Sequence, residues 1–448
     1  MEYLLQSRWM ISSDFKVVRN PSIVIEDEVI VEVTKNGSTP ATRGHDRKSF
    51  EKGLICPAFI NAHTHLPETL LRGLCDDKSL HEWLFDYIWK VEPQMTNQDA
   101  RMGALLGCAE LMASGCVGFI DQYFFAGEIA EAVFETGMKG YLFPSIFGEE
   151  AVQYNPESNT VEESFERAKE VHAAWNEKEN RIFVGFGPHA PFTVSEEWLT
   201  RIAATATALE TKLHIHLNET QREVKEAKEQ WGMTPIEKVA NLSILEHCLA
   251  AHCIHVTDKE IALLRDTKVP VLHCPQSNLK VAAGIAPIPK YLAAGAGELI
   301  CLGTDGQASN NNLDILEEVM LTAVLHKGVH NDPTSVTAAE ALQMATRNPA
   351  QIFPKGSFCR GIKPDEKADL VVFTLDKAHL TPVLDPLSNL VYSAHGSDVQ
   401  LTMSNGKILY ENGHFHTLDI DKVLQSASAS TQEMCRRAGM EKSFSGLE

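Results

Sequence analysis

The sequence predicts an α/β protein: a (β/α)8 TIM-type barrel with a small β-sandwich domain built from both chain ends. In the middle of the chain, apolar β-rich segments alternate with helical patterns, which is typical of a parallel sheet. At both ends, shorter segments alternate apolar and polar residues, as antiparallel strands do. We therefore expect a β-sandwich domain from 1–54 plus 362–419, a barrel domain from 55–361, and a helical tail from 420–448.

The barrel prediction depends on the number of apolar segments. Eight candidate strands occur in order, and eight strand–helix units indicate a closed barrel. They are "GLICPAFINAHTH" from Gly53, Cys116–Tyr123, Gly140–Phe147, Arg181–Ala190, Lys212–Glu219, Cys248–Val256, Val269–Pro275 and Glu298–Gly306. A helical pattern such as Asp99–Gly115 separates neighbouring strands and stops at a glycine, as helices often do.

The two chain ends carry the pattern of a separate sheet. Residues 1–52 contain "YLLQSRWMIS" and "SIVIEDEVIVEV", and Ala368–Leu375 and Val399–Phe415 alternate in the same way. The last segment contains Asn405-Gly406, which is a strong hairpin signal. We expect the two ends to pair with each other, and residues 420–441 to form a surface helix.

The amino-acid composition argues against some classes of binding partner. The chain has 448 residues and a formal net charge of -20, which argues against nucleic acid and anionic membranes as partners. Its ten cysteines form no Cys-x-x-Cys pair, so we interpret them as reduced core residues of a cytoplasmic protein. The first residues do not resemble a signal peptide, and no segment approaches the ~18 apolar residues of a membrane span.

Polar side chains collect at the predicted strand ends, where barrel enzymes have their active sites. His63 and His65 lie two apart at the end of the first strand, so both point to one side and can share a metal ion. The other strand ends supply His189, His216, Glu219, His252, His255, His273 and Asp305. One such residue is weak support, but six of eight strand ends converging on one mouth indicate a site.

Each residue also has a structural interpretation. His214 shares a face with His216 but lies further from the strand end, so we interpret it as a core histidine. We interpret His255 as structural or exposed, and assign no site role to His247 and His326. A helix cap is the alternative role for Asp305 in "GTDG".

Taken together, the motifs resemble the amidohydrolase superfamily, in its chlorohydrolase/deaminase branch, and most closely its methylthioadenosine/S-adenosylhomocysteine deaminases. The resemblance covers nearly the whole chain. It depends on "PAFINAHTHLPETLLRG", "EWLFDYIWKVEP", "FVGFGPHAPFTVSEEWL", "HIHLNETQREV", "AAHCIHVTDKEI", "HCPQSNLKVAAGIAPI" and "LGTDGQASNNNLD". As a set these motifs are specific to the branch, whereas any one is only suggestive.

The resemblance implies a metal site. Its four ligands would be His63, His65, His216 and Asp305, which suit one divalent ion per subunit, zinc or alternatively iron. The fourth strand ends in "GPHAP" without the lysine that dinuclear relatives carbamylate, which favours a single metal.

The resemblance also implies the catalytic groups of a deaminase. Asp305 would move a proton from water to the departing amine, and His252 would hold or polarise that water. Glu219 would protonate the ring nitrogen beside the attacked carbon, since a neutral amidine is a poor electrophile. His273 is expected to support the water or the substrate.

Two further matches concern substrate recognition: Glu92 aligns with a glutamate that binds ribose hydroxyls, and His189 with a histidine that contacts the nucleoside. The chain departs from its relatives in Pro67 and Glu68 after His-x-His, and in Lys90. Phe143–Glu166 contains six glutamates and no Lys or Arg, although relatives that accept S-adenosylhomocysteine can use arginines there.

The sequence therefore predicts a hydrolytic deaminase of an adenosine-type nucleoside (5′-methylthioadenosine, 5′-deoxyadenosine, adenosine or S-adenosylhomocysteine) that releases ammonia. Alternatives are an aminohydrolase or chlorohydrolase of another amidine heterocycle, such as an s-triazine, a pterin or a guanine-like base, and a non-catalytic barrel relative. We expect a small-molecule substrate and a homo-oligomer, either a dimer or a tetramer.

Overall fold

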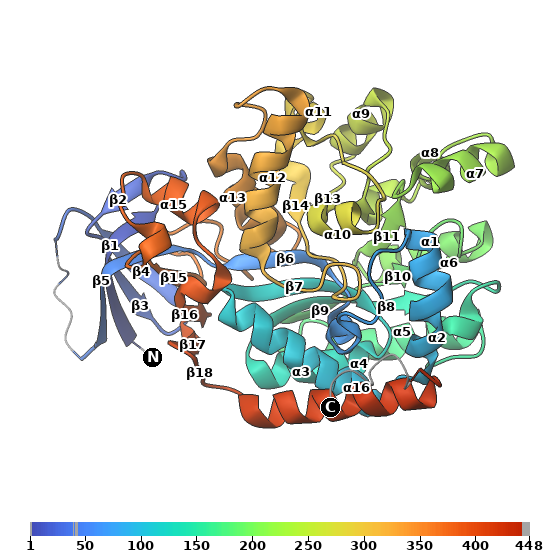
Figure 1. Ribbon diagram of the computed structural model, residues 1–448, viewed down its shortest axis with the longest axis horizontal. Coiled ribbons are helices and arrows are strands. Elements are labelled where there is room, and N and C mark those ends of the chain that lie inside the picture. Colours follow the sequence, from blue (N-terminus) through green and yellow to red (C-terminus); the bar gives the residue numbers. More distant parts are fainter. Residues whose placement is uncertain (1, 39, 41–43, 441–448) are drawn as a thin grey trace.

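The structure is a computed structural model that describes residues 2–38, 40 and 44–440 (Figure 1). Nine parallel strands form two sheets at its centre. The first sheet contains β6 (Phe59–Thr64), β7 (Cys116–Tyr123), β8 (Lys139–Ile146), β9 (Ile182–Val184) and β10 (Gly187–Pro188). The second contains β11 (Leu213–Leu217), β12 (Cys248–His252), β13 (Val271–His273) and β14 (Ile300–Leu302). The eight predicted strand positions are all occupied, and the fourth is divided into β9 and β10.

The two sheets join into a closed barrel. A parallel bridge between Phe186 and Leu213 connects the first sheet to the second. On the other side, the amide of Asp305 donates to the carbonyl of His63 at 2.9 Å, which connects the segment after β14 to β6. Closure brings the carboxyl ends of β6, β11 and β14 to one mouth.

Helices surround the barrel (Figure 1). The helix α3 begins with a capping box between Thr96 and Asp99 and ends just before Gly115, in agreement with the predicted pattern. The helices between the strands are α1 (Leu80–Trp83), α2 (Trp89–Val91), α3 (Asn97–Ala113), α4 (Ala126–Thr136), α5 (Val161–Trp175), α6 (Glu196–Ala208), α7 (Gln221–Trp231), α8 (Pro235–Asn241), α9 (Asp258–Asp266), α10 (Pro275–Lys280) and α11 (Ile288–Ala293). After the last strand come α12 (Ile315–His330), α13 (Ala338–Ala345) and α14 (Arg347–Ala350).

The chain ends form one nine-stranded sheet beside the barrel (Figure 1). Its strands are β1 (Glu2–Ile11), β2 (Val17–Arg19), β3 (Ser22–Glu26), β4 (Val29–Thr34), β5 (Asp46–Pro57), β15 (Leu370–Thr374), β16 (Val399–Ser404), β17 (Lys407–Glu411) and β18 (His414–Phe415). Antiparallel pairing of β5 with β15 joins the two chain ends, as predicted. Asn405-Gly406 forms the expected turn, with φ of 47° and 69°.

This sheet is continuous and curls around its own apolar cluster. A bridge between Val29 and Lys367 brings the edge strand β4 against the segment that leads into β15. Leu5, Ile25 and Met403, from three different strands, pack in the same cluster. The small β domain is therefore present, with hydrogen bonds running through its whole strand order.

The stretch that carries the first two histidines is divided between the two sheets. Gly53–Leu66 reads as one buried strand, but β5 ends at Pro57 and β6 begins at Phe59. Proline lacks the amide that a ladder needs, which favours the change of partner at this point. β5 also runs across the predicted domain boundary between residues 54 and 55. The predicted division of the chain into domains stays a prediction.

The carboxyl-terminal helix α16 (Ile420–Arg437) lies along α3 (Figure 1). It buries Val423, Ala427 and Met434, and Thr431 donates to the carbonyl of Leu70 at 3.0 Å. The helix is therefore packed on the barrel, behind the segment that follows His65. Residues 441–448 of the predicted tail lie outside the described residues. The remaining helix, α15 (Pro386–Tyr392), precedes β16.

Candidate functional site

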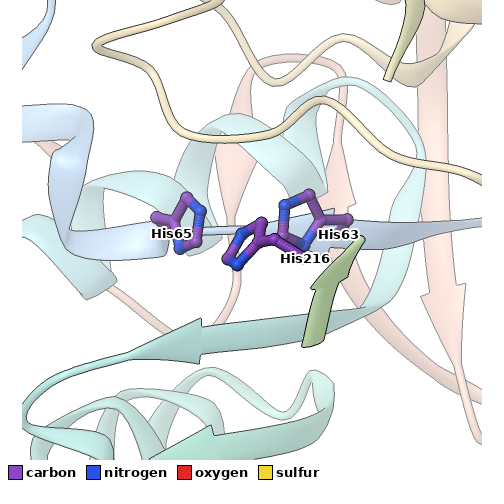
Figure 2. A group of neighbouring side chains, drawn as sticks. All are labelled: His63, His65 and His216. Atoms are coloured by element: carbon purple, nitrogen blue, oxygen red, sulfur yellow. The ribbon is translucent and has the colours of Figure 1, made fainter. Parts of the chain in front are cut away.

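Four predicted ligands meet at the barrel mouth. His63 lies in β6 and His65 directly after it, His216 lies in β11, and Asp305 follows β14. Ligand atoms of His63, His65 and His216 all lie within 4.8 Å of one another, and Figure 2 shows the three rings close together. Asp305 Oδ1 lies 3.3 Å from His63 Nε2 and 3.2 Å from His65 Nε2. These distances leave the four side chains arranged around one point.

Each of the three histidines is held through its other ring nitrogen. His63 Nδ1 lies 3.0 Å from His214 Nε2, His65 Nδ1 lies 2.5 Å from the carbonyl of Gln122, and His216 Nδ1 lies 2.8 Å from the carbonyl of His189. These contacts fix the ring orientations and direct Nε2 toward the common point, as supporting groups do in metal sites. His214, predicted as a core histidine, is fully buried and serves this purpose.

Asp305 is held by hydroxyl groups from α10 and from the turn after β14. Its Oδ2 accepts hydrogen bonds from Ser277 at 2.6 Å and Ser309 at 3.1 Å. Burial by itself raises the pKa of Asp305, but the imidazoles of His63 and His65 beside its carboxylate lower it well below the usual value. The carboxylate is therefore ionised and available as a ligand or a proton acceptor.

These residues fit a single divalent metal ion. Three imidazoles and one carboxylate are a common donor set for zinc or iron. His63 Nε2 is buried without a hydrogen-bond partner, which is costly unless another group occupies that position. The end of the fourth strand supplies His189 to the cavity. Among the described residues that line this cavity, there is no lysine that could bridge two metal ions.

Glu219 and His252 face each other beside the predicted ligands. Glu219 Oε1 lies 3.9 Å from His252 Nε2, and Asn278 Oδ1 lies 2.9 Å from His252 Nδ1. The backbone amide of Glu219 donates to Glu223 at 2.7 Å, which holds the turn after β11. Burial raises the pKa of Glu219 above the usual value for a glutamate, which favours the protonated form of this side chain.

Glu92 and His189 lie further out in the same cavity. Glu92 accepts a hydrogen bond from the hydroxyl of Tyr123 at 2.5 Å, and burial raises its pKa to about 7. His189 Nδ1 lies 3.0 Å from Thr193 Oγ1, and burial lowers its pKa to about 3. A carboxyl group and a neutral imidazole therefore border the outer cavity.

Aromatic and acidic side chains line the cavity. Its lining contains Trp83, Trp89, Phe124, Phe147 and Phe192. It also contains the polar residues His65, Glu68, Glu92, Gln122, Tyr123, Ser145, His189, His216, Glu219, His252 and Asp305. This composition suits a flat, uncharged ring with several hydrogen-bonding groups.

His273 is a predicted site residue that neither lines the cavity nor joins the cluster of predicted metal ligands. Its ring lies 6.2 Å from that of His326 on α12, and both of its nitrogens are buried without a partner. Side chains alternate along a strand, so a residue at a strand end can face the helix layer. The expected support of water or substrate by His273 therefore stays a prediction.

Sequence reasoning missed the supporting residues Gln122, Ser277 and Asn278, as well as Tyr123 and Glu68. All five are buried: Gln122 and Tyr123 at the end of β7, Ser277 and Asn278 in α10, and Glu68 in the short helix η1 (Leu66–Leu71). That burial was the available signal, because "FIDQY" and "PQSN" place polar residues within apolar segments. Their partners depend on strands far away in the sequence.

Comparisons with known proteins agree with this architecture. The chain is 40% identical over 409 residues to a 5-methylthioadenosine/S-adenosylhomocysteine deaminase of Moorella thermoacetica, covering 91% of this chain and 94% of that protein. It is 37% identical over 440 residues to a 5′-deoxyadenosine deaminase of Methanococcoides burtonii, covering 97% and 98%.

Solved structures are similar along nearly the whole chain. An adenosine deaminase from Xanthomonas campestris with bound zinc superposes with a TM-score of 0.91 at 29% identity, covering 97% of this chain and 98% of that one. An atrazine chlorohydrolase from Arthrobacter aurescens has a TM-score of 0.88 at 21% identity, covering 96% and 100%, and so shows the fold alone. The amidohydrolase family profile matches residues 54–409, and this chain therefore belongs to the amidohydrolase family.

Proposed function

We propose that this protein is a metal-dependent hydrolytic deaminase of adenosine-type nucleosides. The proposal depends on one observation. A single cavity with aromatic side chains lies beside the predicted metal ligands and is also lined by Glu219 and His252. A scaffold protein has no need of all these groups at one place. The names of the relatives from Moorella and Methanococcoides point to the same substrate class.

The proposed metal is one zinc ion per subunit, held by His63, His65, His216 and Asp305. The donor set supports zinc or iron, and the Xanthomonas deaminase carries bound zinc. When bound, such a metal would act as a Lewis acid that activates water near neutral pH. Metal analysis of the purified protein checks both the identity and the stoichiometry.

The protein's own side chains would move the protons. Asp305 accepts a proton from the attacking water and passes it to the departing amine, which leaves as ammonia. Glu219 donates a proton to the ring nitrogen beside the attacked carbon, a role suited to a carboxyl group whose pKa burial raises. His252, held by Asn278, orients the water from the other side.

Substrate recognition is assigned to the outer cavity. Glu92 would accept hydrogen bonds from ribose hydroxyls through the oxygen that Tyr123 does not use. The aromatic walls would hold the purine and the 5′ substituent. On this basis we propose 5′-methylthioadenosine, 5′-deoxyadenosine and adenosine as the substrates.

An ammonia-release screen tests the proposal. The screen compares these nucleosides with pterins and s-triazines, using protein of measured metal content. Ammonia from the nucleosides is expected. Release from pterins or triazines alone would overturn the nucleoside assignment, and a metal-free protein without activity would favour a non-catalytic relative.

Two broader expectations also stay predictions: a homo-oligomer, either dimer or tetramer, and a cytoplasmic location. Among the described residues, no helix is both long and apolar enough to cross a membrane. Light scattering coupled to size-exclusion chromatography measures the oligomeric state.

A further inference from the structure

Glu68 is a buried carboxyl group in the cavity that the proposed mechanism does not use. It lies in the short helix η1 (Leu66–Leu71), three residues after His65, and is 4% exposed. It lines the same cavity as Glu92 and Asp305. Its Oε2 is buried without a hydrogen-bond partner among the described residues.

The surroundings of Glu68 hold it in this position. A Cβ atom at residue 306 would lie 1.8 Å from Glu68 Oε2, so only glycine allows the carboxyl group to pack there. Glu68 lines the cavity together with His65, Glu92 and Asp305, so it lies near both the predicted metal ligands and Glu92. Glu68 therefore borders the cavity beside Gly306.

The cavity offers Glu68 no partner of opposite charge apart from histidine. Four carboxyl groups and no Lys or Arg line it, counting only residues that the structure describes. Native proteins rarely keep a buried acceptor unpaired, and such groups often have a functional reason. A hydrogen-bond donor on a bound molecule would give Glu68 a partner in the cavity.

We propose that Glu68 accepts a hydrogen bond from an N–H or O–H group of the bound substrate, and so selects substrates that present a donor to this side chain. This inference rests on the proposed deaminase function. The donor has two possible sources: a ribose hydroxyl shared with Glu92, or a second amino group on the ring. Anionic groups at this position are disfavoured, because Glu68 and Glu92 would repel them.

The experiment measures how the effect of Glu68 depends on the donor. The variants are Glu68→Met, which removes the acceptor at similar size, and Glu68→Gln, which keeps one acceptor oxygen. Glu82→Gln, on the exposed side of α1, is the matched control. The substrates are adenosine, 2′-deoxyadenosine, 3′-deoxyadenosine and the riboside of 2,6-diaminopurine.

The expected result is a loss of kcat/KM in Glu68→Met of ~10-fold to ~100-fold, confined to substrates with the recognised donor. If the donor is a hydroxyl, the variant and wild type become equal on the deoxynucleoside that lacks it. If the donor is a ring amine, wild type prefers the diaminopurine riboside and the variant loses that preference. Glu68→Gln should lie between, and Glu82→Gln should match wild type.

Thermal melting separates this role from a structural one. Removing an unpaired buried carboxyl group should leave the Tm of the ligand-free protein unchanged or raise it, whereas removing a structural partner lowers it. An equal loss on all substrates, or a lowered Tm with unaltered selectivity, would overturn the proposal for Glu68. Metal content should stay at the wild-type level.

Ligand-induced Tm shifts keep the test independent of turnover. If wild type binds the nucleosides without releasing ammonia, the proposed function fails, while a donor-dependent Tm shift that Glu68→Met abolishes still supports Glu68. If wild type deaminates all four substrates and Glu68→Met treats them as wild type does, only the inference about Glu68 fails.

Discussion

At the scale of single residues, the site depends on what holds each functional atom. His63, His65 and His216 each use one ring nitrogen for a protein contact and direct the other to a common point. Those contacts restrict the conformations of the side chains before a metal binds, so metal binding has less conformational entropy to overcome. The binding geometry is thus present in the polypeptide itself.

Loss of one predicted ligand should weaken metal binding. In His216→Ala, we expect metal content well below one ion per chain and loss of ammonia release, because three ligands hold the ion less tightly than four. Metal analysis after dialysis measures this. His247→Ala is the control, since His247 lies outside the cavity, and full metal content with normal turnover in His216→Ala would remove His216 from the ligand set.

Glu219 should affect turnover and leave metal binding intact. Glu219→Gln is nearly isosteric but cannot donate a carboxyl proton, so we expect at least a ~100-fold loss of kcat with wild-type metal content. Glu226→Gln, on the exposed face of α7, should behave as wild type. Loss of metal in Glu219→Gln would instead make this residue a ligand or the support of one.

The residue types at the strand ends were predictable, but their supports were not. The positions of His63, His65, His216 and Asp305 follow from strand ends alone, because all strands of a parallel barrel end at one mouth. The direction of His273 and the contact between His214 and His63 depend on register and on distant strands. A sequence read by itself contains neither.

At the scale of elements, a buried ion pair joins the barrel to the small β domain. Lys139 begins β8 and Asp369 precedes β15, and Lys139 Nζ donates to both oxygens of Asp369 at 2.7 Å. Asp369 also accepts hydrogen bonds from the amides of Cys359 and Asn405. Both side chains are almost completely buried, with 0% and 2% exposed.

Breaking this pair should destabilise the whole protein. In Lys139→Met the carboxylate of Asp369 stays buried without its cation, and we expect a loss of about 3–5 kcal/mol in the free energy of unfolding. Chemical denaturation measures the loss. Lys52→Met, which breaks the exposed pair with Asp376, should cost at most about 1 kcal/mol. Equal effects would show that burial of the Lys139 pair is unimportant.

The sequence predicts the positions of the strands and helices better than it predicts which of them pair or pack together. Apolar periodicity located all eight barrel strands and the pairing of the two chain ends. It could not show that β5 and β6 belong to different sheets, because Gly53–Leu66 is apolar on both sides of Pro57. It also could not show the curl of the small sheet, which depends on the bridge between Val29 and Lys367.

At the scale of the whole molecule, acidic residues outnumber basic ones both in the overall composition and around the proposed substrate cavity. The formal net charge is -20, and the active-site cavity is lined by four carboxyl groups. A second cavity shares Phe192 with the first and is lined by Glu149, Glu150 and Lys238 among others. A long 5′ substituent would extend toward this second cavity.

The fold supplies a cation that the local sequence does not show. Phe143–Glu166 contains no Lys or Arg, but the structure brings Lys238 of α8 to the second cavity. Lys238 forms an ion pair with Glu196, and its Nζ lies 5.4 Å from the centre of the Trp231 ring. Because Glu196 already neutralises it, Lys238 offers little attraction to a further carboxylate.

We therefore expect 5′-methylthioadenosine, 5′-deoxyadenosine or adenosine to have a higher kcat/KM than S-adenosylhomocysteine. The homocysteine carboxylate would meet Glu149 and Glu150 with Lys238 already paired, which should cost about 1–3 kcal/mol, or about 5–150-fold in specificity. Kinetics at low and high salt measure the difference, and Lys238→Gln is the informative variant. A preference for S-adenosylhomocysteine that weakens with salt and disappears in Lys238→Gln would show that Lys238 leaves Glu196 and binds the carboxylate of the substrate.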